Sequence, residues 1–305
     1  MKKKIAIIFL LMLTLCGCTK RFNTEVDVDG KKVEKSYVSN IICRPESEEL
    51  KEIYSTNKDN LIVDYDKLPA CKDLKINSGG YEGLWTSIFV KPLAWIIVKV
   101  GVIVKNYGVA IMIVGLVLRA LMFPLSKKSM NMSDNMQKAQ KDLNKLEKKY
   151  KGREADRDAM MAKSQEMLLI YKKYDISPLS GCLFSFLQLP IFFAFLEAVY
   201  RVPAFFEKNF LVFNLGTTPL EGFKAGNYWY IILVLLIIGA TYFSFKNMNV
   251  SGDAEQARQM KMMSTFMIVF ISMVSFTLPT SIALYWIVSN GFTVVQNLIL
   301  KKGKL

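Results

Sequence analysis

A single arginine in an otherwise uncharged stretch is the residue whose chemistry stands out in this sequence. Residues 106–126 contain no charged side chain apart from Arg119, which precedes Lys127 by eight residues. On a helix this spacing places Arg119 about 12 Å inside the apolar segment. An arginine in lipid costs at least about 2.5–3.5 kcal/mol and stays charged, so it must find a carboxylate, backbone carbonyls or water.

The other apolar stretches offer Arg119 no carboxylate within them. Glu197 is the acid nearest to a span interior, and Arg201, four residues later, is its better partner. We therefore expect a water-filled cavity around Arg119, lined by polar side chains of other helices. The candidates are Gln188, Thr241, Ser272, Ser275, Ser289, Asn290 and Gln296. The alternative is a guanidinium that snorkels to the headgroups, although a side chain of about 6 Å is short for that distance.

The uncharged regions of the chain must supply the helices that position Arg119. A hydrocarbon core of about 30 Å needs about 20 residues of helix. Residues 176–196 and 225–245 meet that length, and 262–300 is long enough for two helices separated at Pro279. The sequence therefore predicts an all-α membrane protein with five transmembrane helices. Their expected bounds are 106–126, 180–202, 227–246, 261–279 and 281–300.

Composition agrees with that fold class and argues against catalysis. The 305 residues are 52% apolar with a net charge of +14, which fits a membrane protein with basic flanks. The chain has no histidine, the usual general base and commonest metal ligand. We therefore expect a protein that is not an enzyme and that needs no metal or cofactor.

Residues 1–17 are expected to be a lipoprotein signal peptide. Lys2 to Lys4 form a positive start, and Ile5 to Leu15 form an apolar core too short to span a bilayer. The segment ends in L-C-G-C, which resembles the bacterial lipobox. That resemblance implies cleavage after Gly17 and attachment of diacylglyceryl, with acyl chains such as palmitate, at Cys18. The alternative is an uncleaved anchor with a free Cys18 thiol.

Lysine and arginine placement predicts the orientation of the spans. The positive excess falls on 127–175, 246–261 and the short basic tail 301–305, which alternate to one side. Positive connections face the cytoplasm. The C-terminus is therefore expected in the cytoplasm and the lipid-anchored N-terminus outside a bacterial cell membrane.

Two segments precede the first span. Residues 18–84 are polar and are expected to form an external region, in which Cys43 and Cys71 are either bridged or free thiols. Residues 85–105 are expected to lie on the outer membrane surface as an amphipathic helix. Pro92 suits the first turn of its regular part, residues 92–105. The sequence does not determine the fold of the external region.

The connection 127–176 is expected to be an antiparallel helical hairpin in the cytoplasm. Steps of three and four residues predict one seam at Met136, Ala139, Leu143, Leu146 and Tyr150. The same steps predict a second seam at Met160, Ser164, Met167, Tyr171 and Tyr174. Lys151-Gly152 would end the first helix, and Glu154, Asp156 and Asp158 suit the start of the second. The hairpin could be a structural connector or a docking site for a partner.

Three stretches resemble the YidC/Oxa/Alb family of membrane protein insertases, in its Gram-positive lipoprotein branch. They are G-L-W-T-S-I-F-V-K-P-L-A-W (83–95) with N-Y-G-V-A-I and L-R-A-L-M-F-P-L after it, S-P-L-S-G-C-L-F-S-F-L-Q-L-P-I-F-F-A-F (177–195), and F-T-L-P-T-S-I-A-L-Y-W-I-V-S-N (276–290). The resemblance implies a hydrophilic groove open to the cytoplasm and to lipid. Arg119 matches the groove arginine of the family, and Gln188 and Trp286 fall in motifs beside the groove. With Thr241, Ser289 and Asn290 they form the expected substrate site.

The resemblance also implies the partners. These are nascent membrane proteins, the lipid bilayer and, through the 127–176 hairpin, the Sec translocon, the ribosome or the signal recognition machinery. No direct nucleic-acid site is evident. The family's helices that meet substrate spans correspond to Phe184–Phe195 and Met263–Phe276. Residues 19–82 look longer than this branch needs, and the tail after Leu300 is too short for ribosome docking through a basic tail.

Three other functions compete with insertion. A transporter or scramblase could bind an anionic substrate at Arg119, but it should show two matching halves with broken helices. An intramembrane enzyme lacks histidine and paired acids within the spans. A purely structural lipoprotein anchor leaves Arg119 unexplained.

Overall fold

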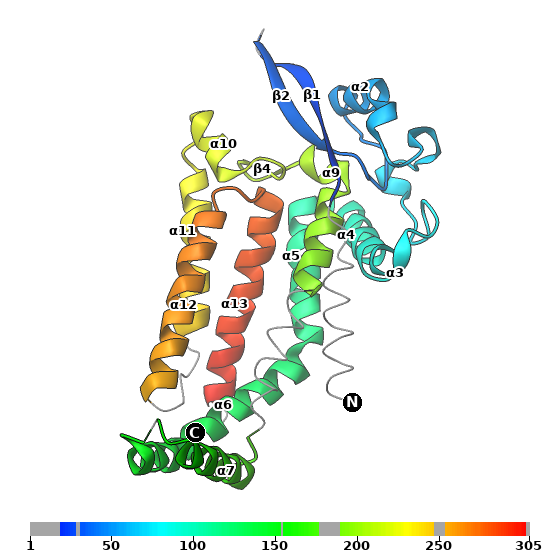
Figure 1. Cartoon of the computed structure of the whole chain (residues 1–305). Coiled ribbons are helices and arrows are strands. Elements are labelled where there is room, and N and C mark those ends of the chain that lie inside the picture. The colour runs from blue at the N-terminus through cyan, green and yellow to red at the C-terminus, as the bar shows by residue number, and fades with distance from the viewer. Residues whose placement is uncertain (1–18, 29–30, 154, 177–189, 247–253, 303–305) are drawn as a thin grey trace. The chain divides into compact units, whose positions relative to one another are not determined.

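Helices make up most of the described chain, and two short pairs of antiparallel strands accompany them (Figure 1). The computed structural model describes residues 19–28, 31–153, 155–176, 190–246 and 254–302. The chain divides into two compact units. The first comprises Met1–Gly115, Gln188–Leu233 and Thr277–Trp286, and the second comprises Leu116–Leu187, Val234–Phe276 and Ile287–Leu305. The prediction of a mainly helical protein is confirmed.

A small N-terminal subdomain, residues 19–82, begins the first unit. β1 (Arg21–Val28) pairs antiparallel with β2 (Lys31–Val38). α2 (Glu48–Thr56) follows, and then three short 3-10 turns, η1 (Lys58–Asn60), η2 (Tyr65–Lys67) and η3 (Cys71–Asp73). The strands, α2 and the turns enclose a core of Phe22, Val38, Ile41, Tyr54, Tyr65 and Leu68. The region whose fold the sequence left open is therefore a folded piece with its own core.

A disulfide closes this subdomain. Cys43 and Cys71 are bonded, their Cα atoms are 4.8 Å apart, and both side chains are fully buried. Of the two alternatives left open by the sequence, the bridge is the one present. A small core gains much from such a crosslink, because closing a loop of this length lowers the entropy of the unfolded chain by an equivalent of about 3–4 kcal/mol.

A continuous helical run leads from the subdomain into the apolar part of the chain. It comprises α3 (Gly83–Trp85), the π-type turn η4 (Thr86–Val90) and α4 (Lys91–Val104), with a proline in the first turn of α4 as expected. By length and composition, Gly83–Val104 could cross a membrane. The location of residues 85–105 on the membrane surface therefore stays a prediction.

A tight turn joins α4 to α5 (Tyr107–Leu121). Lys105 has a left-handed φ of 55°, and Asn106 Oδ1 accepts the backbone N–H of Val109 at 3.0 Å. The Tyr107 ring packs on α4 so closely that a Cβ at Gly101 would lie 2.1 Å from Tyr107 Cδ1. A glycine at this position is what allows the Tyr107 ring, at the start of α5, to lie against α4.

The described part of the second predicted span, 180–202, is the helix Pro190–Tyr200. Residues 177–189, including Gln188, lie outside the described residues. α9 (Pro203–Phe206), the strand pair β3 (Asn209–Phe210) and β4 (Phe213–Asn214), and α10 (Pro219–Lys224) come next. Thr218 and Glu221 form a capping box that fixes the start of α10.

The second unit contains the predicted helical hairpin, formed by α6 (Phe123–Tyr150) and α7 (Arg157–Lys173). α6 begins earlier than the predicted residue 127, because Pro124 starts a new helix directly after α5 ends. Gly152 has a φ of 82° just after α6 ends, and the Asp156 carboxylate accepts the N–H groups of Asp158 and Ala159 at the start of α7. The predicted stop and start signals are confirmed at these residues, while Glu154 lies outside the described residues.

The packing of the hairpin confirms one predicted seam and corrects the other. On α6, the seam residues Met136, Ala139, Leu143, Leu146 and Tyr150 are buried or partly buried in the hairpin core. On α7, Met167, Tyr171 and Tyr174 pack as predicted, with Ile170 beside them. Met160 and Ser164 are exposed instead, so their prediction is wrong. Ala159 and Ala162 pack against α6 near the turn, because small side chains let the helices approach closely there.

Three more helices complete the described chain, α11 (Tyr230–Lys246), α12 (Ala254–Val274) and α13 (Thr280–Lys302). The expected break at Pro279 is present, although α12 already ends at Val274. Thr280–Ile299 is long and apolar enough to cross a membrane, whereas the apolar parts of α5, the helix Pro190–Tyr200, α11 and α12 are shorter. Five apolar helices are therefore found where five spans were predicted, and their crossing of a membrane stays a prediction.

Candidate functional site

The structure brings Arg119 into contact with one of the predicted polar residues. Arg119 lies in the last turn of α5 and is half-buried. Its Nε donates a hydrogen bond to the hydroxyl of Ser289 on α13, a side chain that is only 2% exposed. Both residues belong to the second unit. A permanent cation is thus held beside a buried hydroxyl at the place where two apolar helices meet.

Other predicted polar residues are buried in the same unit. Thr241 is fully buried on α11, and Asn290 and Gln296 are buried on α13. Removing such groups from water is costly unless they form hydrogen bonds. The buried part of this unit is therefore not purely hydrophobic. Its polar side chains are groups that can solvate a charge.

The other predicted residues that the structure describes, Ser272, Ser275 and Trp286, make contacts of their own. The hydroxyls of Ser272 and Ser275 donate to carbonyls of their own helix segment, at 2.7 Å each, which satisfies them locally. Trp286 belongs to the first unit, where its ring lies edge-on to Phe192 with centroids 5.3 Å apart. Within the described ranges, no group of three or more His, Cys, Asp or Glu side chains is placed to hold a metal ion.

A second charged group, which we call the Arg201 cluster, lies in the first unit and comprises Glu82, Trp85, Lys91, Glu197 and Arg201. The predicted pair is confirmed, since Arg201 Nη1 lies 3.4 Å from Glu197 Oε1. Arg201 Nη2 also pairs with Glu82, and Lys91 Nζ lies 2.7 Å from Glu82 Oε1. Trp85 Nε1 donates to Glu197 Oε2 at 2.9 Å. Arg201 and Lys91 are 1% and 3% exposed, so their charges depend on these partners.

The Arg201 cluster was only partly visible in the sequence. The spacing of Glu197 and Arg201 predicted that pair, but nothing linked it to Glu82 and Lys91. A weak signal was available, because Lys91 is the one cation in the otherwise apolar stretch 83–98. Burial would raise the pKa of Glu82, yet Arg201 and Lys91 together lower it below its ordinary value. Glu82 is therefore held as a carboxylate.

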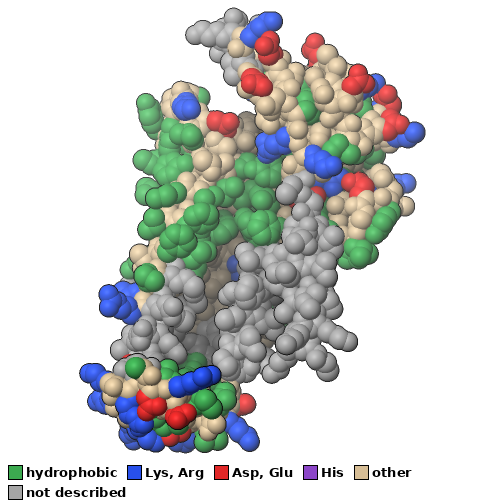
Figure 2. Space-filling view, in the orientation of Figure 1, with side chains coloured by type: hydrophobic (Ala, Val, Ile, Leu, Met, Phe, Trp, Pro, Cys, Tyr) green, Lys and Arg blue, Asp and Glu red, His purple; other side chains and the backbone are tan. Residues whose placement is uncertain are grey.

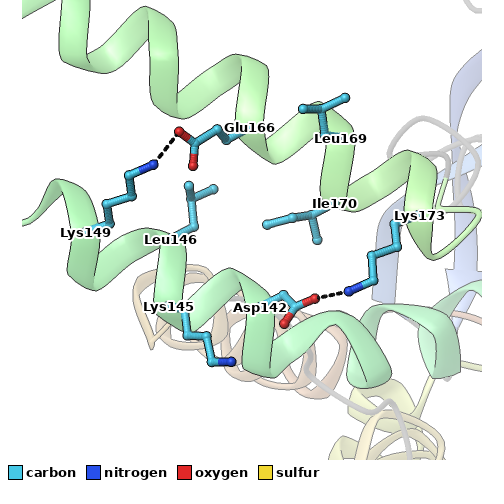
Figure 3. A pocket seen from close by; sticks show the side chains of 8 residues that line it. All are labelled: Asp142, Lys145, Leu146, Lys149, Glu166, Leu169, Ile170 and Lys173. Carbon is cyan, nitrogen blue, oxygen red and sulfur yellow. Dashed lines mark hydrogen bonds and ion pairs between the residues drawn. The ribbon is translucent and has the colours of Figure 1, made fainter.

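The hairpin carries a shallow cavity of about 350 Å³ between α6 and α7 (Figure 3). Two ion pairs flank it, Lys149 with Glu166 at 2.6 Å and Lys173 with Asp142 at 2.7 Å. Lys145 and the aliphatic side chains of Leu146, Leu169 and Ile170 complete its lining. The rim is charged and exposed, which suits a contact with a hydrated partner more than a buried ligand.

Apolar side chains are exposed along α12. They recur at steps of three or four residues, and the four most regular, each at least half exposed, are Met262, Phe266, Phe270 and Met273. Figure 2 shows hydrophobic side chains over α11 and α12, and charged side chains over the hairpin and the N-terminal subdomain. Soluble proteins rarely expose apolar stripes of this extent. Helices with exposed apolar surfaces, together with the half-buried Arg119, indicate an integral membrane protein.

Comparison with known proteins names the family. A family described as "60Kd inner membrane protein" matches residues 99–305. The membrane protein insertase YidC of Oceanobacillus iheyensis is 34% identical over 227 residues, which cover 72% of this chain and 85% of that protein. The membrane protein insertase MisCA of Bacillus subtilis is 31% identical over 218 residues, which cover 71% and 79%. The chain therefore belongs to the YidC/Oxa/Alb family of membrane protein insertases.

A solved structure supports the same conclusion at the level of the fold. It is described as an active YidC insertase with its first transmembrane domain resolved. The TM-score is 0.50 with 28% sequence identity, and the match covers 74% of this chain and 48% of that chain. The N-terminal subdomain lies outside the residues 99–305 that match the family.

Proposed function

We propose that this insertase admits the hydrophilic ends of nascent membrane proteins into a polar groove around Arg119 and releases their apolar segments into the bilayer. The observation that carries the proposal is the half-buried Arg119 with its hydrogen bond to Ser289. Thr241 and Asn290, both buried in the same unit, would extend the groove. The assignment of Gln188 and Trp286 to the substrate site rests on the family motifs and stays a prediction.

The proposed role of Arg119 is electrostatic. A polar or acidic end that enters the membrane loses hydration, which costs several kcal/mol for a charged group. A fixed cation and groove water replace part of that hydration and lower the barrier. The apolar segment that follows supplies the driving force, because its burial in lipid is favourable. Such a cycle needs no covalent step and no cofactor.

We propose that the substrate leaves along the second and fourth spans. The exposed stripe on α12 supports this, because it combines Met262 and Met273 with Phe266 and Phe270. Methionine side chains are flexible and polarizable, so they can pack against apolar segments of different shapes. Such a surface would receive many substrate sequences without selecting one.

The proposed topology has five spans in a bacterial cell membrane, with the lipid-anchored N-terminus outside and the C-terminus in the cytoplasm. The hairpin α6–α7 then projects into the cytoplasm. We propose it as the contact for the Sec translocon, the ribosome or the signal recognition machinery. The charged rim of its cavity, formed by residues such as Lys145, Lys149 and Lys173, supports this role.

The central test compares Arg119→Lys and Arg119→Ala in the full-length protein. Arg119→Lys should keep much of the activity, since lysine also presents a cation to groove water. Arg119→Ala should fold but insert substrates with acidic translocated ends at least about tenfold more slowly, and neutral ends should suffer less. The measurement is the insertion rate into vesicles for paired substrates that differ only in the charge of that end.

Two further measurements make this test decisive. Arg258→Ala removes an exposed cation from α12 in the same unit and should leave insertion unchanged. In Arg119→Cys, the thiol should react with water-soluble reagents from the cytoplasmic side only. Wild-type insertion of acidic ends by Arg119→Ala, or a thiol closed to the cytoplasmic reagent, would return Arg119 to a snorkelling role.

A further inference from the structure

The N-terminal subdomain makes a continuous interface with the chain that follows the helix Pro190–Tyr200. Arg201 Nε donates to the carbonyl of Asn40 at 2.6 Å, and the N–H of Ile42 donates to the carbonyl of Arg201 at 3.0 Å. The guanidinium of Arg21 lies over the Tyr200 ring, 4.9 Å from its centroid. Backbone and side chain of Arg201 thus both hold the subdomain.

A second set of contacts lies a few residues further on. The Glu207 carboxylate accepts the backbone N–H groups of Glu46 and Ser47, at 3.0 and 2.8 Å, and the Ser47 hydroxyl at 2.8 Å. Ser47 is the N-cap of α2, so Glu207 places a negative charge where the helix dipole favours one. Lys208 Nζ lies 3.1 Å from Glu46 Oε2. We call the contacts of residues 40–47 with residues 201–208 the subdomain interface.

The subdomain interface is tied to the start of the first long helical run through the Arg201 cluster. Arg201 pairs with Glu82 and Glu197, and Lys91 pairs with Glu82. Buried charges are costly when a partner moves away, so these pairs favour one arrangement of the three segments. The disulfide acts on the same place, because Cys43 directly follows Ile42, whose N–H bonds to Arg201.

We propose that the N-terminal subdomain holds the end of the second span in a fixed position during insertion, and that Arg201 and Glu207 are the positioning residues through which it acts. This inference rests on the proposed function, because the second span is one of the two along which substrate would leave. The subdomain lies outside residues 99–305, which match the family, whereas Arg201 and Glu207 lie within them.

Amide hydrogen exchange of the full-length protein in lipid vesicles tests the inference. Arg201→Gln and Glu207→Ala should each speed exchange of residues 197–206 by about tenfold or more, because a loosened interface lets that segment open. Lys67→Gln is the matched control, since Lys67 forms an exposed ion pair with Asp64 on the subdomain. It should leave residues 197–206 unchanged.

A coupling measurement separates positioning from simple loss of fold. Removing the disulfide with Cys43→Ser and Cys71→Ser should speed exchange at 197–206 in the wild-type background and add little in the Arg201→Gln background. Arg201→Lys keeps a cation for Glu82 and should give an intermediate rate. If Arg201→Gln does not accumulate, Glu207→Ala carries the same comparison, because its contacts are only partly buried.

Insertion rates complete the test. Variants at Arg201 and Glu207 should slow substrates with acidic and neutral ends equally, whereas Arg119→Ala should discriminate between them. Failure of the Arg119 proposal therefore leaves the exchange result standing, and the reverse also holds. The inference is overturned if exchange at 197–206 stays at its wild-type rate while that of the subdomain rises, or if insertion is unaffected when 197–206 has loosened.

Discussion

Two arginines, Arg119 and Arg201, lie in different surroundings, and we expect them to act differently. Arg119 is half-buried and donates to the Ser289 hydroxyl, so we expect a polar or acidic end of a substrate to reach it. Arg201 is 1% exposed and paired with Glu82 and Glu197, and we expect it to hold structure and not to receive substrate.

At the residue scale, Gly101→Ala tests the close contact between α4 and the Tyr107 ring. Its new Cβ would lie 2.1 Å from Tyr107 Cδ1, so the ring or the helix must shift. We expect destabilisation by about 1–3 kcal/mol, measured as the shift in thermal unfolding of the protein in detergent. Gly239→Ala is the control, because a Cβ there meets nothing within 4 Å. Equal unfolding temperatures for the two variants would contradict the close packing of Tyr107.

At the element scale, the hairpin α6–α7 combines a buried seam with exposed ion pairs. Leu143→Asp puts a charge at a side chain only 6% exposed and should melt the hairpin, with insertion impaired more than the fold of the apolar helices. Leu168→Asp, at a side chain 62% exposed, is the control. Exchange protection of residues 136–174 and insertion rates are the measurements. Similar behaviour of both variants would show that the seam has been assigned to the wrong face.

The ion pairs of the hairpin give it a pH dependence of known sign. Hydrogen bonds from Lys173 and Tyr174 lower the pKa of Asp142, and hydrogen bonds from Lys149 and Tyr150 lower the pKa of Glu166. A carboxyl with a lowered folded pKa stabilises the fold above its unfolded pKa, and that stability is lost as pH falls through the folded pKa. Exchange in the hairpin should therefore rise, modestly, only below about pH 4. The variant Asp142→Asn with Glu166→Gln should show a smaller rise, the remainder coming from Asp156, whose pKa is also lowered, chiefly by the hydrogen bond from Arg153. A rise near neutral pH would contradict the cause given.

At the scale of the whole molecule, two features would attach the protein to the membrane. They are the apolar helices and a lipid on Cys18. The L-C-G-C end of the signal motivates the second. Metabolic labelling with a fatty-acid probe should mark the wild type and not Cys18→Ser. Because the acyl chains add little to the membrane binding of several apolar helices, Cys18→Ser should remain in the membrane fraction. Equal labelling of the two proteins would rule out this lipidation site.

The sequence by itself determined the features that depend on neighbours along the chain. Uncharged stretches located the apolar helices, Gly152 and Asp156 marked the ends of the hairpin helices, and the pair Glu197–Arg201 followed from its helical spacing. Each of these depends on a helix period or a cap, and both are local properties of the backbone. The family resemblance likewise rests on order and spacing within short stretches.

Only the tertiary structure decided which distant groups meet. Ser289 was one of seven polar candidates for Arg119, and the approach of α13 to α5 brings its hydroxyl to the guanidinium. The bridge between Cys43 and Cys71, and the joining of Glu82 and Asn40 to Arg201, depend on how the N-terminal subdomain folds against residues 201–208. On α7, Ala159 packs where Met160 was expected, because periodicity alone does not say which of two adjacent stripes faces the partner helix. Such choices arise from packing between segments, and the spacing of residues within one segment does not contain that information.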